Sequence, residues 1–202
     1  MEELLNKSTQ TLLCEFWDFS EKTEELLKKL DVSVKLPIDI KKFAKKLGLR
    51  IEDDVGLIPF SERHYGYINQ NTIIIRPNLR YKEKMWAIAK AIANFLIYEK
   101  GLLISDPFLV GYNPDDFYLD ALTILILFPI SLFKKEISEN IGKTNDDLLQ
   151  YLSDRSQISL FQMSIGYQIL KQMLWFQRNL SFERCNYDIT QVSADEYENI
   201  FI

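Results

Sequence analysis

Hydrophobic residues recur every three or four positions along most of the chain, the spacing that turns one side of a helix toward a core. Gly48 is suited to end one such helix, and Pro129 interrupts another. Asn145 is suited to cap the helix that follows it. The pattern predicts helices over residues 2–30 (as one helix or two), 38–48, 82–98, 116–127, 130–141, 146–156 and 159–180.

Two stretches between the second and third of these helices have the β-branched and alternating residues of strands. The segment "RIEDDVGLIPF" at 50–60 predicts a strand followed by a loop. The segment "YGYINQNTIIIRP" at 65–77 predicts a hairpin that turns at Asn69-Gln70-Asn71. Residues 102–115 contain Pro and Gly at several positions and predict a loop. The sequence therefore predicts a helix-dominant α+β fold with a small antiparallel sheet.

Composition and charge narrow the class of protein. The chain of 202 residues has 29 acidic and 24 basic side chains and a formal net charge of −5, so no overall field draws it to nucleic acid. The first residues lack the basic segment of a secretory signal, and the longest apolar run is interrupted by Asp120 and Pro129. Cys14 and Cys185 are far apart and suggest two reduced thiols. We expect a cytoplasmic protein without a membrane span.

The segment "MWAIAKAIANFLIYEKG" at 85–101 is apolar except for a few positions, and Lys90 and Asn94 stand four residues apart within it. This is the spacing at which His-Glu-x-x-His places two zinc ligands on one face of a helix. The chain has one histidine, His64, which cannot build a site of that kind. The sequence leaves two interpretations: an ordinary core helix with a polar stripe, or a metal site without its ligands.

The order of segments resembles the ImmA/IrrE family of zinc peptidases, which occurs around phage and mobile-element repressors. The resemblance covers residues 36–175. It includes the helix in "LPIDIKKFAKKLGLRIE", the hairpin in "GYINQNTIIIRPNL", and "MWAIAKAIANFLI" at the position of the active-site helix. "DFYLDALTILILFP" is similar to the helix that carries the family's third ligand, and 146–174 to a small helical region beyond. The resemblance implies a zincin-like fold.

The departures from the family pattern fall on the residues of its active site. Under the resemblance, the first histidine corresponds to Lys90, the catalytic glutamate to Ala91 and the second histidine to Asn94. The carboxylate ligand corresponds to Asp116, and an asparagine of the family to Asp120. A protonated lysine has no lone pair for zinc, and alanine cannot act as a general base. The resemblance thus implies a protein with no catalytic residue, no metal and no cofactor.

We predict an ion pair between Lys90 and Asp116 in the site that has lost its zinc. An ammonium group at the position of the first ligand would compensate a carboxylate that zinc no longer neutralises, and Asn94 would complete the hydrogen bonds. The alternative places Lys90 at the helix surface, with its aliphatic stem over apolar neighbours.

The domain organisation follows from the same pattern. We expect an N-terminal helical segment at 1–35, a degenerate peptidase-like domain at 36–142, a small helix-turn-helix-like region at 143–187, and an acidic tail at 188–202. Five aromatic residues are candidates for lining a peptide-binding cleft, with core packing as the alternative: Tyr65, Tyr67, Trp86, Phe117 and Tyr118.

The function that this reasoning predicts is that of a pseudopeptidase acting by protein–protein binding. It would be a phage or mobile-element regulator or inhibitor whose partner is a repressor or a host defence protein. Two alternatives stay open: an active hydrolase with a displaced site that uses His64, Asp116 and Asp120, and a DNA-binding regulator that uses residues 146–174. Nucleic acid is the less expected partner because the second helix of that region has few basic residues. The sequence leaves the oligomeric state open.

Overall fold

The computed structural model describes residues 7–53, 64–99, 109–111 and 117–179. These residues form seven α-helices and four β-strands, and the chain is a helix-dominant α+β protein, as predicted. The elements are, in chain order, α1 (Lys7–Lys29), α2 (Ile40–Lys46), β1 (Arg50–Asp53), β2 (His64–Asn69), β3 (Thr72–Ile75), α3 (Tyr81–Glu99), β4 (Leu109–Gly111), α4 (Phe117–Leu127), α5 (Ile130–Glu139), α6 (Asn145–Ser156) and α7 (Leu160–Asn179).

The four strands form one sheet in the order β1-β3-β2-β4. β2 pairs with β3 as the predicted hairpin, and β4 pairs with β2 on the other side, both antiparallel. β1, however, pairs with β3 in parallel, with Ile51 opposite Ile73. The prediction of an antiparallel sheet was therefore wrong for this strand. β1 pairs with β3, and β2 lies between these two strands in the chain, so no tight turn forces them to run in opposite directions.

The hairpin turns at Gln70 and Asn71, within the predicted turn, and Gln70 has a φ of 51°. Gly66 is required in β2, because a Cβ atom there would overlap the backbone of Ile74 on β3. The prediction of a continuous loop over 102–115 was also wrong, since three of these residues form β4. This short edge strand lacks an alternating pattern of its own and is positioned by its partner β2.

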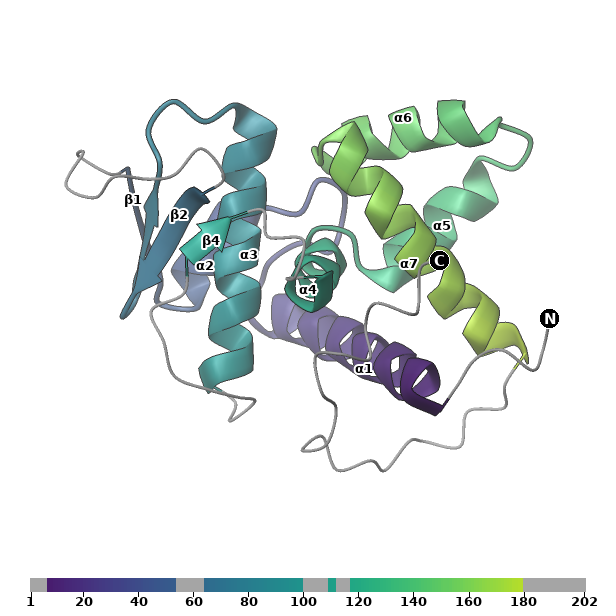
Figure 1. The fold of residues 1–202 in the computed structure, drawn as a ribbon, viewed down its shortest axis with the longest axis horizontal. Coiled ribbons are helices and arrows are strands. Elements are labelled where there is room, and N and C mark those ends of the chain that lie inside the picture. Colours follow the sequence, from purple (N-terminus) through teal and green to yellow (C-terminus); the bar gives the residue numbers. More distant parts are fainter. Residues whose placement is uncertain (1–6, 54–63, 100–108, 112–116, 180–202) are drawn as a thin grey trace.

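Helix α3 lies between the sheet and α4 (Figure 1). Ile73 and Ile75 of β3 are buried, whereas their neighbours along the strand are only partly covered, so one face of the sheet packs against the core. Nearly all of α4 is buried, which accounts for its almost continuous run of apolar residues. The two most buried helices thus pack against each other at the centre of the molecule, in a single core cluster that extends from α1 to α7.

The N-terminal helix belongs to this core. α1 packs against α4 and also contacts α5 and α7 (Figure 1). Two of its side chains satisfy the N-terminus of α5, where Pro129 offers no side-chain cap. The Ser20 hydroxyl accepts a hydrogen bond from the backbone of Ile130 at 3.1 Å, and the Glu24 carboxylate accepts one from that of Ser131 at 3.3 Å. These bonds fix the position of α5 relative to α1.

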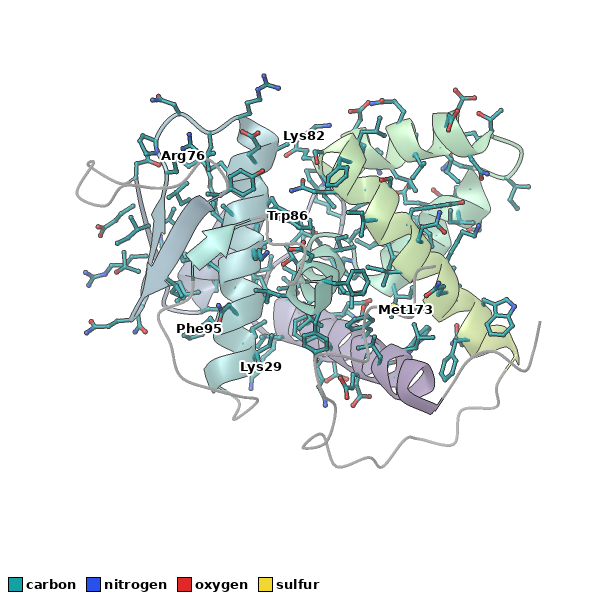
Figure 2. The ribbon with its side chains drawn as sticks, viewed as in Figure 1. Lys29, Arg76, Lys82, Trp86, Phe95 and Met173 are labelled. Atoms are coloured by element: carbon teal, nitrogen blue, oxygen red, sulfur yellow. The ribbon has the colours of Figure 1, made fainter. Side chains whose placement is uncertain are left out.

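Helices α6 and α7 form the predicted helical pair. Thr144, not Asn145, caps α6: its hydroxyl accepts a hydrogen bond from the backbone of Asp147 at 3.2 Å. Gly166 lets α7 approach α4 closely, because a side chain there would overlap Ile124. Lys82 of α3 forms an ion pair with Asp154 of α6, with Nζ 3.1 Å from Oδ1; Figure 2 labels Lys82. The helical pair is therefore packed onto the rest of the fold and linked to α3.

The structure bears on the predicted absence of a membrane span, whereas several residues named in the sequence lie outside the described ranges. No single described helix is long and apolar enough to cross a membrane, although α4 and α5 pass that test together as a pair bent by 65°. Asp116, Cys185 and the tail at 188–202 lie outside the described residues.

Candidate functional site

The polar residues of α3 face α4 from the middle of the core. Lys90 and Asn94 are one helical turn apart, so their side chains leave the same side of the helix. Lys90 is 0% exposed and Asn94 is 2% exposed. Ala91 is also fully buried and adds no functional group between them. The interpretation of Lys90 as a surface residue was therefore wrong, because α3 is covered on all sides in this region.

Asp120 of α4 provides the negative charge that accompanies Lys90. Lys90 Nζ lies 2.7 Å from Asp120 Oδ1, and the carboxylate-bearing side chain keeps 12% of its surface exposed. The approach is that of a close ion pair, although Oδ1 lies off the direction of a well-formed hydrogen bond. We call Lys90, Asn94 and Asp120 the Lys90 cluster.

The acidic partner that was predicted for Lys90 was Asp116. Asp116 lies outside the described residues, so its contact with Lys90 stays a prediction. Asp120 follows it by four residues in the sequence. Asp120 was expected at the site, but Lys90 was expected to pair with Asp116. The signal that could have paired them is that each is a lone charge in an otherwise apolar stretch of helix.

The carboxamide of Asn94 is the unusual feature of the cluster. Both its Oδ1 and its Nδ2 are buried, and neither has a hydrogen-bond partner. The prediction that Asn94 completes the hydrogen bonds of the ion pair was therefore wrong. Thr123 of α4, which is also fully buried, donates its hydroxyl to the backbone carbonyl of Leu119 at 2.7 Å. An unmet buried polar group costs about 1–3 kcal/mol of folding stability, so Asn94 destabilises the folded core at this position.

Tyr65 of β2 connects the cluster with the partly exposed edge of the core. Its ring is partly buried. Burial raises the pKa of the Tyr65 hydroxyl, and the carboxylates of Glu83 and Asp120 raise it further, against the opposite effect of Arg76. The phenol therefore lies within electrostatic range of Asp120. Within the Lys90 cluster, Lys90 and Asn94 are buried, and Asp120 keeps the largest exposed fraction.

The other aromatic candidates are dispersed. Trp86 is buried on α3, one turn before Lys90 (Figure 2). Tyr118 packs on Phe16 of α1, with ring centroids 5.5 Å apart, and its hydroxyl donates to the Glu15 carboxylate at 3.4 Å. Burial raises the pKa of Glu15, and this hydrogen bond partly opposes the shift. Phe117 is partly buried against the core, and the Tyr67 side chain is not described. Trp86 and Tyr118 thus serve in packing.

The described residues contain no group of three or more His, Cys, Asp or Glu side chains that could hold a metal ion. His64 begins β2, and its side chain is not described. Of the residues named for a displaced hydrolytic site, only Asp120 can therefore be examined, and it is engaged with Lys90. Within the described ranges, the ligand positions implied by the resemblance hold an ammonium, an amide and no imidazole.

The helical pair offers little positive charge for DNA. α6 begins with Asp146 and Asp147 and also carries Asp154. Lys171 of α7 lies over the Tyr167 ring of the same helix, with its nitrogen 5.5 Å from the ring centroid. Arg155 contacts the Glu136 carboxylate at 3.3 Å. The cations of this pair are thus few and partly engaged, which does not favour phosphate contacts.

Comparisons of the chain with protein-family models, with curated proteins and with solved structures find no match. The resemblance described above therefore rests on the order of segments and on the spacing of residues in the sequence.

Proposed function

We propose that this chain is a catalytically inactive, ImmA/IrrE-like pseudopeptidase that acts by protein–protein binding. In this proposal α3 is the active-site helix of a degenerate zincin-like fold. A helix packed between a small sheet and α4, with two polar residues four apart facing α4, supports that assignment.

The observation that carries the proposal is the buried ion pair between Lys90 and Asp120. The ammonium occupies the position that the resemblance gives to the first imidazole ligand, and a carboxylate 2.7 Å away balances its charge. A protonated lysine has no lone pair to offer a metal. Asn94 is a poor zinc ligand beside imidazole, and Ala91 cannot activate water. The chemistry of these three positions supports binding without hydrolysis.

The resemblance supplies the class of partner. A protein derived from a repressor peptidase, having lost its chemistry, can keep the surface that recognises its target. We therefore propose that the partner is a repressor or a host defence protein, and that the chain regulates or inhibits it by stoichiometric binding as part of a phage or another mobile genetic element.

The experiment is affinity capture of the tagged chain from lysate of its host, followed by mass spectrometry and by incubation of the purified partner with excess chain. The proposal expects one specific partner, absent from a tag-only control, that keeps its full length during the incubation. Cleavage of the partner would refute the pseudopeptidase. Recovery of nothing above the control would refute the binding function.

A further inference from the structure

The charge of the chain is unevenly distributed along it. Residues 28–50 contain eight basic and two acidic side chains, a net charge of +6, so the rest of the chain carries −11. Both acids of this segment are engaged at the start of α2. The Asp31 carboxylate lies 3.5 Å from the Lys42 ammonium, and the Asp39 carboxylate accepts a hydrogen bond from the Lys42 backbone at 3.0 Å. The excess positive charge is therefore not neutralised within the segment.

Six lysines of this segment are exposed and have no acidic partner among the described residues. We call them the lysine surface: Lys28, Lys29, Lys35, Lys41, Lys45 and Lys46. Elsewhere in the described ranges most cations are engaged, since six are in ion pairs and three more lie over aromatic rings. Among the described residues, uncompensated positive charge is thus concentrated on the lysine surface.

The outward side of α2 consists of lysines. Ile40, Phe43 and Ala44 are buried and turn one side of this short helix toward the core. With the period of an α-helix, the four lysines of α2 lie on the opposite side. The packing of α2 against the core therefore fixes its ammonium groups on the surface.

The end of α1 adjoins this side of α2. Lys28 and Lys29 lie in the last turn of α1, and Figure 2 labels Lys29. Just beyond that turn, the backbone carbonyl of Asp31 accepts a hydrogen bond from the ammonium of Lys42 on α2. This contact joins the end of α1 to α2, so the lysines of both helices contribute to one positively charged region.

The lysine surface has charge but no large exposed apolar group. None of the highly exposed large hydrophobic side chains of the described residues falls between 28 and 50, and Phe43, the only aromatic residue there, is fully buried. A helix that lies on a bilayer inserts an apolar face, and single-stranded nucleic acid stacks its bases on aromatic rings. This segment offers neither feature on its surface, so both kinds of partner are disfavoured.

The small extent of the charge favours a protein over duplex nucleic acid. α2 has seven residues and is about 10 Å long. Duplex DNA carries one negative charge per about 1.7 Å of its axis, so most phosphates of a bound duplex would extend beyond the surface, toward a remainder of the chain that carries −11. A protein with a local group of Asp and Glu side chains matches the lysine surface without that repulsion.

We propose that the lysine surface binds an acidic face of the protein partner. This inference rests on the proposed function and gives the place and the chemistry by which that partner is recognised. Because the surface consists of exposed ammonium groups, it contributes to the rate of association and to the selection of the partner more than to apolar contact.

The test measures the fluorescence anisotropy of a labelled peptide of Asp and Glu residues that is titrated with the full chain at low and at physiological salt. A labelled DNA duplex and phosphatidylcholine vesicles containing phosphatidylserine are titrated in parallel. Lys41→Glu/Lys45→Glu reverses two charges of the surface, and Lys41→Gln/Lys45→Gln removes them. The matched control, Lys22→Glu/Lys135→Glu, makes the same change of net charge at exposed lysines of α1 and α5. Circular dichroism confirms that each variant is folded.

The inference expects saturable binding of the acidic peptide to the wild type, weaker as the salt concentration rises. The dissociation constant at low salt should rise at least about tenfold in Lys41→Glu/Lys45→Glu and stay within about twofold in the control, because only the first variant turns attractions at the surface into repulsions. The glutamine variant should lie between these two. The duplex and the vesicles should bind more weakly than the peptide at physiological salt.

Three results would overturn the inference. Equal weakening in the reversal variant and in its control would show that only net charge matters. Absence of peptide binding at low salt would show that the surface does not attract an acidic protein segment. Tighter binding of the duplex or the vesicles than of the peptide would assign the surface to nucleic acid or to lipid. None of these results touches the proposed function, which fails only on partner capture and cleavage, so the two failures can be told apart.

Discussion

Two buried acidic side chains, Asp120 and Glu136, differ in how completely the polar groups around them are hydrogen-bonded. Glu136 on α5 is 4% exposed, and both of its oxygens are engaged: the Tyr151 hydroxyl donates to Oε2 at 2.7 Å, and Arg155 donates to Oε1 at 3.3 Å. Asp120 has the Lys90 ammonium beside it, yet the neighbouring Asn94 amide is left unmet. The satisfied network around Glu136 holds α5 against α6, whereas the buried Asn94 amide of α3 makes no hydrogen bond.

The largest effect should come from removal of the buried ammonium. Lys90→Met removes the ammonium that lies 2.7 Å from the Asp120 carboxylate, and we expect it to lower the free energy of unfolding by about 3–5 kcal/mol in urea denaturation. The control is Lys22→Met, which breaks an exposed pair with Asp18 on α1 and should cost about 0.5 kcal/mol or less. The double variant Lys90→Met/Asp120→Leu should recover much of the loss. Equal small losses in both single variants would remove the distinction between the buried and the exposed pair.

The complete network should respond less strongly. Glu136→Leu removes the acceptor of the Tyr151 hydroxyl, which can still reach water because that ring is only partly buried. We expect a loss of about 1.5–3 kcal/mol in the same denaturation experiment, the usual range for a hydrogen bond to a charged group. A loss larger than that of Lys90→Met would reverse the order on which the comparison depends.

The incomplete network should gain from an apolar replacement. Asn94→Leu keeps the branched shape and the number of heavy atoms of the side chain and removes two unmet polar atoms, so we expect the unfolding free energy to rise by about 1 kcal/mol. Asn140→Leu, which breaks a satisfied hydrogen bond, should lower it. Thermal unfolding followed by circular dichroism measures both. A clear loss of stability in Asn94→Leu would mean that the amide is already satisfied in solution.

The smallest effect concerns Glu15. Like Glu136, Glu15 accepts a hydrogen bond from a tyrosine hydroxyl, but no cation is among the causes of its pKa shift. Burial raises its pKa above 4.5, so the folded state binds the proton more tightly than the unfolded state does. Stability from this group is present below pH 4.5 and is lost as the pH rises through the raised pKa. The difference in unfolding free energy between wild type and Glu15→Gln should therefore fall from pH 4 to pH 7. A difference that rises over this range would contradict the sign of the shift.

Much of the fold follows from the apolar pattern, because a buried helical face imposes its period on the sequence. The pattern gave every described helix, and the hairpin followed from its β-branched strands. The short strand β4 and the parallel direction of β1 could not be predicted this way, since both depend on partners distant in the chain. The cap of α6 was wrong by one position because Thr144 and Asn145 are both good caps, and only the extended backbone at Thr144 decides between them.

The candidate site was predictable in part. The spacing of Lys90 and Asn94 placed both on one side of a helix, but the sequence left open whether Lys90 is buried or lies at the helix surface. The pairing of Lys90 with Asp120 depends on how α3 and α4 cross, which no local pattern encodes. The unmet amide of Asn94 is likewise a consequence of packing.

The most direct test of the central claim is the zinc content of the purified chain, measured by inductively coupled plasma mass spectrometry after expression in zinc-supplemented medium. The variant Lys90→His/Ala91→Glu/Asn94→His restores the ligand spacing and serves as the comparison. The account predicts no zinc above background in the wild type and up to about one equivalent in the variant, because the ion pair of Lys90 and Asp120 then gives way to imidazole ligands. A full equivalent of zinc in the wild type would contradict the account.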